Sequence, residues 1–333
     1  MIEIQHLEKT FKVLNRKQGL KGAFSDLFSK DYNYVKAVND ISLHIDKGEI
    51  VGYLGPNGAG KSTTIKMMTG ILSPSSGKIL ISGTEPYENR RKHAQNIGVV
   101  FGQRSQLWWS LPVIESYRVL KEIYKIDDEA YNRNLKLFED LVDIKSLYGK
   151  PVRQLSLGQR MLCEVIAAFL HDPKVVFLDE PTIGLDVSIK DKIRGIIKHL
   201  NEEKKTTIVL TSHDTSDIEA LCERAVIIDK GTLIFDNTIE NLKQMFGRYR
   251  TLKVSTSDQS NQKDIISKLL EKQFTKEEYT IGEEEGNMLS IVINEQKVPL
   301  TKVLNYLLTN LEIKDVQIED VGVESVIKKI YEG

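Results

Sequence analysis

The sequence predicts an α/β protein built on a parallel sheet, with a small α+β domain after it. Three observations support this fold class. Residues 49–64, EIVGYLGPNGAGKSTT, read as a strand, a glycine-rich turn and the start of a helix. Residues 175–179, VVFLD, form an apolar run that ends in a carboxylate, as expected of a buried parallel strand. Near Phe246 the composition changes, and strands and helices follow in a new order.

The overall composition is that of an ordinary globular protein. The chain has 333 residues, of which 41% are hydrophobic and 28% are charged, and its net charge is −1. This length favours one large domain and one small domain. Because the charges nearly balance, they give no overall argument for nucleic acid binding, and we expect no nucleic acid partner.

The N-terminal residues, the apolar runs and the cysteines indicate the cellular location. The first residues, MIEIQHLEKTF, lack the apolar core of a signal peptide, and no run approaches the roughly 18 apolar residues that span a bilayer. Cys163 and Cys222 lie in apolar helical contexts without a CxxC pair, so we expect buried free thiols in a reducing compartment. The sequence therefore predicts a soluble, cytoplasmic protein that reaches a membrane only through a partner or a surface.

The elements of the first half follow from their periodicity. Residues 1–13 and 35–46 read as strands, and Lys47-Gly48 turns into the strand of the glycine-rich stretch. Between them, LKGAFSDLFSK predicts a short amphipathic helix that rests on a membrane surface, on a partner or on its own domain. Its apolar face would comprise Leu20, Ala23, Phe24, Leu27 and Phe28.

The middle of the chain alternates between strands and helices. A strand ends at Gln103, and residues from about 104 to 170 then show helical patterns, which predicts a helical subdomain. After the VVFLD strand come a helix at 189–200, the strand TTIVLTSH, the helix SDIEALCE and a hairpin that turns at 229–231. We expect one domain to cover residues 1–245, with antiparallel strands added to the parallel sheet.

Residues 246–333 predict a separate α+β domain. Their order is β-α-β-β-α-β with a last helix in VESVIKKIY, which suits a ferredoxin-like accessory domain. The segment has no cluster of acid, base or metal-ligand residues, so we expect a regulatory or structural role for it.

The glycine-rich stretch matches the spacing of a phosphate-binding P-loop. Glycines let successive backbone N–H groups turn inward around an anion, at the N-terminus of the following helix. Lys61 would reach the β- and γ-phosphates, and the Ser62 hydroxyl would take one Mg²⁺ position. The alternative is a chance glycine-rich turn, which the flanking strand and helix disfavour. The nucleotide-contacting loop would comprise Gly55, Pro56, Asn57, Gly58, Ala59, Gly60, Lys61, Ser62 and Thr63.

Two carboxylates end the VVFLD strand. Because successive strand residues face opposite ways, Asp179 and Glu180 are suited to different tasks. Asp179 would hold Mg²⁺, and Glu180 would polarise the attacking water as a general base. The alternative, a solvated acidic turn, fits poorly with a pair that ends an otherwise apolar strand.

Over roughly residues 2–240 the sequence resembles the ATP-binding subunit of an ATP-binding cassette (ABC) transporter. Six motifs of that family occur in order: GPNGAGKST, VVFGQ, LSLGQR, VVFLDEP, TIGLD and LTSHD. One such motif would be a weak signal, whereas six at compatible spacings leave little room for another family. The resemblance implies a P-loop ATPase core with a helical subdomain, using ATP and Mg²⁺.

The resemblance also implies roles for residues that would otherwise be ordinary. Gln103 would contact the γ-phosphate and Mg²⁺ and sense the membrane partner, although alone it is a plain loop amide. His213 would link the γ-phosphate to the catalytic carboxylate, where a single histidine is more often structural. Asp186 would lie in a loop that crosses a dimer interface. Catalysis would then rest on Glu180, His213 and Gln103.

An aromatic side chain that stacks on adenine is also implied. Phe11 matches the family position, but most relatives have tyrosine there, and the long insertion after it makes Tyr32 and Tyr34 alternatives.

The signature motif departs from the commonest form, LSGGQ, at Leu157. Ser156, Gly158 and Gln159 remain, and these supply a hydroxyl and close backbone N–H groups at a helix N-terminus. In this family the signature of one subunit completes the P-loop site of another. The resemblance thus implies a homodimer around two ATP molecules, or pairing with a related subunit.

The form LSLGQRMLCE…DEPTIGLD and the tail IEDVGVESVIKKIY are similar to ATPase subunits of ABC-2-type exporters. The implied partners are separate integral membrane permeases, which would hold the chain at the inner face of the membrane and choose the substrate. Trp108 and Trp109 would either line the groove for a permease helix or pack inside the helical subdomain. The alternatives are an importer subunit and a soluble ABC ATPase that acts on ribosomes or DNA.

Overall fold

The computed structural model describes residues 1–14, 32–102, 105–212, 214–245, 249–257 and 261–320. The chain divides into two compact units, Met1–Asn237 and Thr238–Gly333, so the division falls before the expected boundary at residue 245. The amphipathic helix expected near residues 20–28, the last expected helix, Gln103 and His213 all lie outside the described residues.

The first unit contains a six-stranded sheet in the order β5-β6-β7-β3-β8-β9. The pairings from β5 to β8 are parallel, as the sequence predicts. All five residues of β7 are buried, because helices and a second layer cover both faces of a parallel sheet. The strands are β3 (Ile50–Leu54), β5 (Ile97–Phe101), β6 (Val175–Asp179), β7 (Thr207–Thr211), β8 (Arg224–Asp229) and β9 (Thr232–Thr238).

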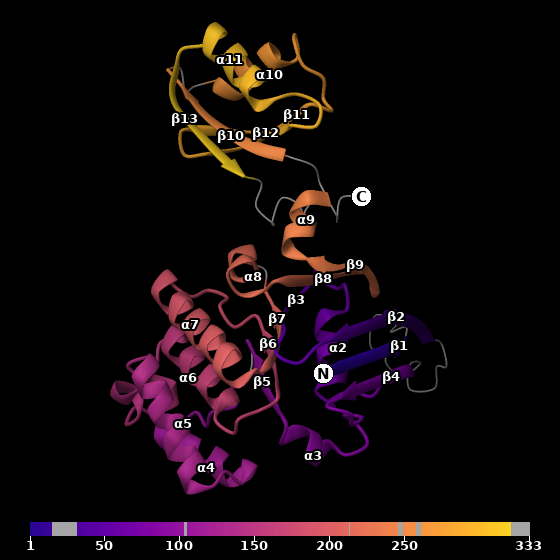
Figure 1. The fold of residues 1–333 in the computed structure, drawn as a ribbon, viewed down its shortest axis with the longest axis vertical. Coiled ribbons are helices and arrows are strands. Elements are labelled where there is room, and N and C mark those ends of the chain that lie inside the picture. The colour runs from indigo at the N-terminus through magenta and orange to yellow at the C-terminus, as the bar shows by residue number, and fades with distance from the viewer. Residues whose placement is uncertain (15–31, 103–104, 213, 246–248, 258–260, 321–333) are drawn as a thin grey trace, which may run out of the picture. The chain divides into compact units, whose positions relative to one another are not determined.

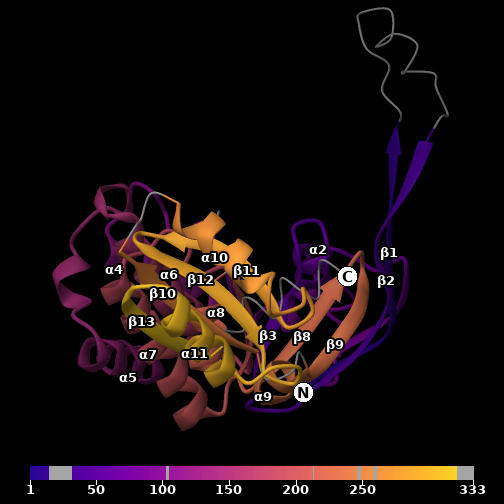
Figure 2. The same ribbon diagram turned by 90° about the horizontal axis from the view of Figure 1, so that it is seen from above.

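A second, antiparallel sheet has the order β2-β1-β4. Its strands are β1 (Ile2–Leu14), β2 (Tyr32–Ile45) and β4 (Ser76–Ile81). In Figure 2, β1 and β2 run side by side as a long ribbon. One hydrophobic core joins this sheet to β3 and to helix α2 (Lys61–Met68), with Tyr53, Ile65 and Met68 fully buried in it. Helix α2, which follows the P-loop, thus shares one core with residues of both sheets.

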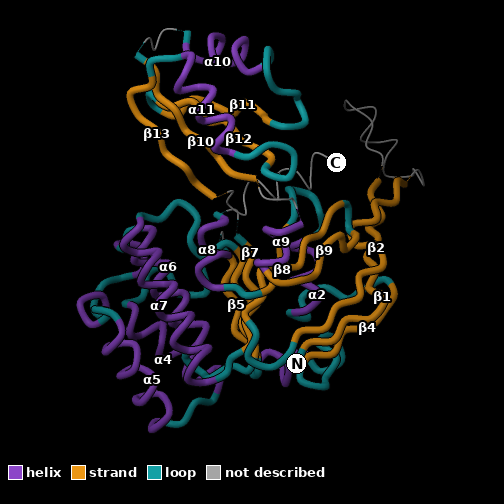
Figure 3. The backbone as a smooth tube through the Cα atoms, turned by 45° about the horizontal axis from the view of Figure 1, so that its top comes forward, coloured by secondary structure: helices purple, strands orange, loops and turns teal. Residues whose placement is uncertain are grey.

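Helices gather beside β5, β6 and β7 (Figures 1 and 3). The expected helical subdomain contains α4 (Val113–Tyr124), α5 (Asp128–Leu141) and α6 (Leu157–Phe169), and α6 is packed on both β5 and α7 (Val187–Lys204). Apart from α2, the other described helices of the unit are α3 (Arg90–Ala94) and α8 (Thr215–Leu221), with 3₁₀ turns at Lys145–Leu147 and Val152–Gln154. Cys163 and Cys222 are both buried and free, as expected. Within the described ranges, no helix is long and apolar enough to cross a bilayer.

The second unit has an antiparallel sheet in the order β11-β12-β10-β13. Its own core includes Leu252 and Ile291 of the sheet, with Ile266 and Leu307 of the helices fully buried. Helix α9 was not expected, because seven residues are too few for a helical period to stand out. The elements are α9 (Ile239–Met245), β10 (Tyr249–Thr256), α10 (Gln262–Leu270), β11 (Tyr279–Glu285), β12 (Met288–Asn294), α11 (Leu300–Asn310) and β13 (Ile313–Asp320).

Candidate functional site

The glycine-rich loop between β3 and α2 has the backbone of an anion-binding turn. Gly58 and Gly60 have φ values of 83° and 105°, in the left-handed region that favours glycine. A Cβ on Gly60 would lie 2.4 Å from the carbonyl oxygen of Ala37, so only glycine fits there. Gly60 is also the N-cap of α2 and offers no side-chain cap, which leaves the first N–H groups of the helix for a ligand. These features fit a bound phosphate.

The side chain of Lys61 is hydrogen-bonded to the start of the loop. Its Nζ donates to the carbonyl oxygens of Gly55 at 2.6 Å and Pro56 at 3.2 Å. Burial lowers the pKa of the ammonium group, and the charges of Glu180 and Asp179 oppose this shift. A phosphate at the loop would offer Lys61 a charged partner in place of two neutral carbonyls.

A cavity of about 310 Å³ lies beside the loop. Its lining brings together Ser62 of α2, Asp179 at the end of β6 with Glu180 after it, and Gly102 after β5. Two larger cavities in the first unit, of about 380 Å³ and 510 Å³, are lined by none of the predicted site residues. Ser62, of the predicted P-loop residues, thus shares one cavity with the carboxylate pair at the carboxyl ends of parallel strands.

Thr211 connects the two carboxylate positions. Its hydroxyl donates to Asp179 Oδ1 at 2.7 Å and accepts from the backbone N–H of Glu180 at 3.1 Å. Strand β6 ends at Asp179, and Glu180 has a φ of 56°, so the alternation of strand side chains does not extend to Glu180. The sequence argument that the pair faces opposite ways is therefore wrong, and both residues line the same cavity.

The residues next to Gln103 and His213 lie at the same edge of the sheet. The N–H of Gly102 donates to the carbonyl oxygen of Asp179 at 2.9 Å. Ser212 follows directly after Thr211, the last residue of β7 and the partner of Asp179 across the sheet. Gly102 and Ser212, the described neighbours of Gln103 and His213, therefore lie beside the carboxylate pair.

A buried glutamate that sequence reasoning missed holds the segment after Gln103. Glu164 of α6 accepts hydrogen bonds from the Ser105 hydroxyl and, at 3.0 Å, from the N–H of Gln106. The Gln106 side chain donates back to the carbonyl oxygen of Glu164 at 2.9 Å. Burial raises the pKa of Glu164, and these hydrogen bonds partly offset the shift. A glutamate within the apolar run of α6 was the available signal.

The signature residues form the start of α6. Ser156 is its N-cap and makes a reciprocal capping box with Gln159, at 3.2 Å and 3.1 Å. Gly158 is buried, and a Cβ there would lie 3.1 Å from Ile189 of α7. Asp186 caps α7 by accepting from the N–H of Ile189 at 3.0 Å. The signature and the TIGLD loop therefore pack together.

The candidate adenine-stacking residues lie on the ribbon of β1 and β2. Phe11 pairs with Val35, whereas Tyr34 and Tyr32 pair with Lys12 and Leu14, farther along the ribbon. Ala37 of β2 approaches Gly60 of the P-loop. Because Phe11 pairs with Val35, two residues from Ala37, it lies closer along the ribbon to the loop than Tyr34 or Tyr32 does.

Trp108 and Trp109 are 39% and 53% exposed. The guanidinium of Arg160 lies 5.6 Å from the Trp109 ring centroid. The alternative in which both indoles pack inside the helical subdomain is therefore wrong.

A glycine-rich loop with the backbone of an anion-binding turn after β3, and a carboxylate pair at the end of β6 in the same parallel sheet, are typical of a P-loop nucleotide-binding protein. Comparisons with known proteins narrow this class. A family model described as ABC transporter matches residues 38–183. The ABC transporter ATP-binding protein NatA of Bacillus subtilis (strain 168) is 33% identical over 215 residues, covering 65% of this chain and 87% of NatA.

A second relative agrees with this family, and a solved structure agrees with the fold. The bacitracin transport ATP-binding protein BcrA of Bacillus licheniformis is 32% identical over 258 residues, covering 77% of this chain and 80% of BcrA. A dimeric structure of the ATP-binding cassette MJ0796 bound to ADP and Pi superposes with a TM-score of 0.59 at 24% identity, covering 72% of this chain and 99% of that one. The chain belongs to the ATP-binding proteins of ABC transporters, and it binds and hydrolyses ATP.

Proposed function

We propose that two copies of this chain enclose two ATP molecules and power export through separate membrane permeases. The observation that carries the dimer is the position of the signature motif. Ser156 and Leu157 are exposed at the start of α6, and the lining of the P-loop cavity includes neither of them. A second copy could therefore present its signature helix to the γ-phosphate held by the P-loop.

The residues of the cavity suit an ATP–Mg²⁺ complex. Ser62 and Asp179 offer the oxygen ligands that Mg²⁺ prefers, and a single carboxylate suffices when phosphates and waters supply other ligands. We assign both to Mg²⁺, together with Gln103; the ion would neutralise charge that develops on the transferred phosphoryl group. Glu180 acts as the general base for the attacking water, and His213 contacts the γ-phosphate.

Export is supported by the form of the signature motif and by a relative named for bacitracin transport. The exposed Trp108 and Trp109 supply apolar surface, close in sequence to Gln103, for a permease helix. The second unit has a regulatory or structural role in this proposal.

Replacing Glu180 tests the catalytic part of the proposal. The change Glu180→Gln should lower steady-state ATP turnover by at least about 100-fold while ATP binding persists, because only the base is lost. With ATP and Mg²⁺ the variant should then run as a dimer in size-exclusion chromatography. The matched control is Glu202→Gln, at an exposed position of α7, which should leave turnover unchanged.

Two results would contradict the proposal. Normal turnover in Glu180→Gln would remove Glu180 as the base, and a monomer at saturating ATP would remove the dimer. The permease partner is tested separately by isolating the tagged chain from membranes. A multi-span membrane protein should copurify with it, whereas ribosomes in its place would identify the soluble alternative.

A further inference from the structure

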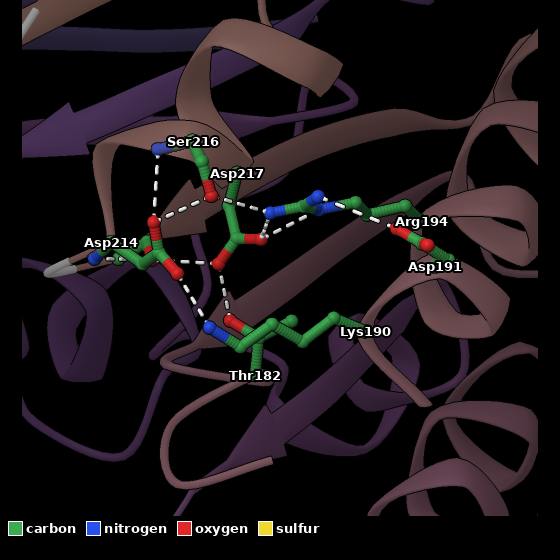
Figure 4. A network of polar contacts seen from close by, with 8 residues as sticks. Thr182, Lys190, Asp191, Arg194, Asp214, Ser216 and Asp217 are labelled. Carbon is green, nitrogen blue, oxygen red and sulfur yellow. Dashed lines mark hydrogen bonds and ion pairs between the residues drawn. The ribbon is translucent and has the colours of Figure 1, made fainter. Parts of the chain in front are cut away.

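A buried carboxylate, Asp217, lies at the centre of a polar network in the first unit (Figure 4). Its side chain is 1% exposed. Arg194 of α7 donates to Asp217 Oδ1 through Nε at 2.7 Å and through Nη2. The hydroxyls of Thr182 and Ser212 both donate to Oδ2, the second at 3.0 Å. Four donors thus satisfy the charge that burial would otherwise penalise.

A second carboxylate extends the network. Asp214 Oδ2 accepts from Lys190 Nζ of α7 at 2.5 Å, and its N–H donates to the Ser212 hydroxyl at 3.0 Å. Lys190 and Ser216 hold the pKa of Asp214 down at about 2, so this carboxylate is ionised at neutral pH. Ser216 is also a partner of Arg194, whose Nη2 donates to its hydroxyl at 2.7 Å.

The network joins three segments with separate tasks in the proposed reaction. Thr182 lies two residues after Glu180. Lys190 and Arg194 belong to α7, which begins at the Asp186 cap. Ser212 and Asp214 are the neighbours of His213 on either side, and both are bonded within the network.

We propose that Asp217, held by Arg194, is a positioning residue for hydrolysis. It ties the backbone on both sides of residue 213 to α7 and to the segment after Glu180. These contacts hold the chain on either side of residue 213 against the stretch after Glu180 and against α7, which follows the TIGLD loop. The inference rests on the proposed roles of Glu180 and His213, and Asp217 itself touches no reacting atom.

The same unit offers a matched pair with no link to the site. Arg224 of β8 binds Asp236 of β9 in a bidentate fashion, at 2.6 Å and 2.9 Å. The side chains of Arg224 and Arg194 are 23% and 20% exposed, but Asp236 is 25% exposed whereas Asp217 is 1% exposed. The Asp236 pair therefore controls for the loss of an Arg–Asp ion pair, and thermal unfolding measures the additional stability cost at the more buried Asp217.

The experiment compares Asp217→Asn with Asp236→Asn in steady-state ATP hydrolysis and thermal unfolding. We expect Asp217→Asn to lower kcat on the order of 10- to 100-fold, because small misplacements of catalytic groups have effects of this size. KM for ATP should stay within about threefold, since the P-loop is untouched. Asp236→Asn should leave kcat unchanged. Arg194→Lys and Arg224→Lys form a milder second pair for the case in which Asp217→Asn fails to fold.

A double-mutant cycle with His213→Ala separates positioning from a purely structural role. If Asp217 acts through residue 213, Asp217→Asn should have little further effect on the residual single-turnover rate of His213→Ala. An equal loss in both backgrounds, or an unchanged kcat in Asp217→Asn and Arg194→Lys, would overturn the inference. Failure of the proposed function would appear differently, as normal turnover in Glu180→Gln.

Discussion

The hydroxyl of Thr211 donates to Asp179 Oδ1 at 2.7 Å across the β6–β7 pairing. The same hydroxyl accepts from the N–H of Glu180 at 3.1 Å, so one oxygen contacts both members of the carboxylate pair. A second hydrogen bond, from that N–H to the carbonyl oxygen of Thr211, keeps the backbone of Glu180 in place independently of the hydroxyl. The hydroxyl therefore acts mainly on the orientation of Asp179.

Replacing Thr211 by valine should weaken Mg²⁺ use more than it weakens the fold. Valine keeps the shape of the side chain but removes the hydrogen bond that orients Asp179. Loss of such an outer partner lowers metal affinity about 10-fold. We expect the Mg²⁺ concentration for half-maximal ATP turnover to rise by about that factor in a titration at saturating ATP.

Thr211→Ser is the matched control, because it retains the hydroxyl and should keep the wild-type Mg²⁺ dependence. Equal Mg²⁺ curves for the valine and serine variants would show that the hydroxyl does not act on the metal position.

Thr211 also shows what the sequence alone could and could not predict. The P-loop, its flanking strand and helix, and the carboxylates after β6 follow from local patterns of a few residues. The contact between Thr211 and Asp179 depends on β6 and β7 being neighbours, which joins residues 32 positions apart. No local periodicity carries that information.

The same reason applies to the buried polar residues. Asp217 looks like an ordinary helical carboxylate in the sequence, and its importance follows only from the partners that tertiary packing brings to it. Glu164 stands out as a charge within the apolar run of α6, but the segment that it holds is set by tertiary packing. The division after Asn237 has no local signal for a related reason: helix α9, which belongs to the second unit, directly follows β9 without any loop-like composition between them.

His171 should make the stability of the protein depend on pH. Its ring stacks on Tyr124 at 3.8 Å, its Nε2 donates to the carbonyl oxygen of Ile97 at 2.9 Å, and the buried Nδ1 has no hydrogen-bond partner among the described residues. Burial lowers the pKa of the ring from 6.5 to about 4. The unfolded chain therefore binds a proton at a pH where the folded chain does not.

The contribution of His171 to stability is complete above pH 6.5 and is lost as the pH falls towards 4. We expect the free energy of unfolding of the wild type to fall by on the order of 3 kcal/mol more than that of His171→Phe over this interval. Urea unfolding of both proteins at several pH values measures the difference. Parallel pH dependences in the two proteins would show that His171 titrates normally in the folded state.

A negative charge at position 159 should leave the stability of the fold unchanged but should lower ATP turnover. Glutamate at this position can still accept from the N–H of Ser156 in the capping box, and a carboxylate in the first turn suits the helix dipole. The free energy of unfolding of Gln159→Glu should therefore stay within about 0.5 kcal/mol of the wild type.

In the proposed dimer the same carboxylate would face the γ-phosphate bound by the other copy. Because like charges at an interface cost several kcal/mol, ATP turnover should fall at least about tenfold. Gln154→Glu makes the same charge change at an exposed position outside the signature and serves as the control. If both variants hydrolyse ATP at the wild-type rate, no phosphate faces Gln159, and the signature of a second copy does not complete the P-loop site.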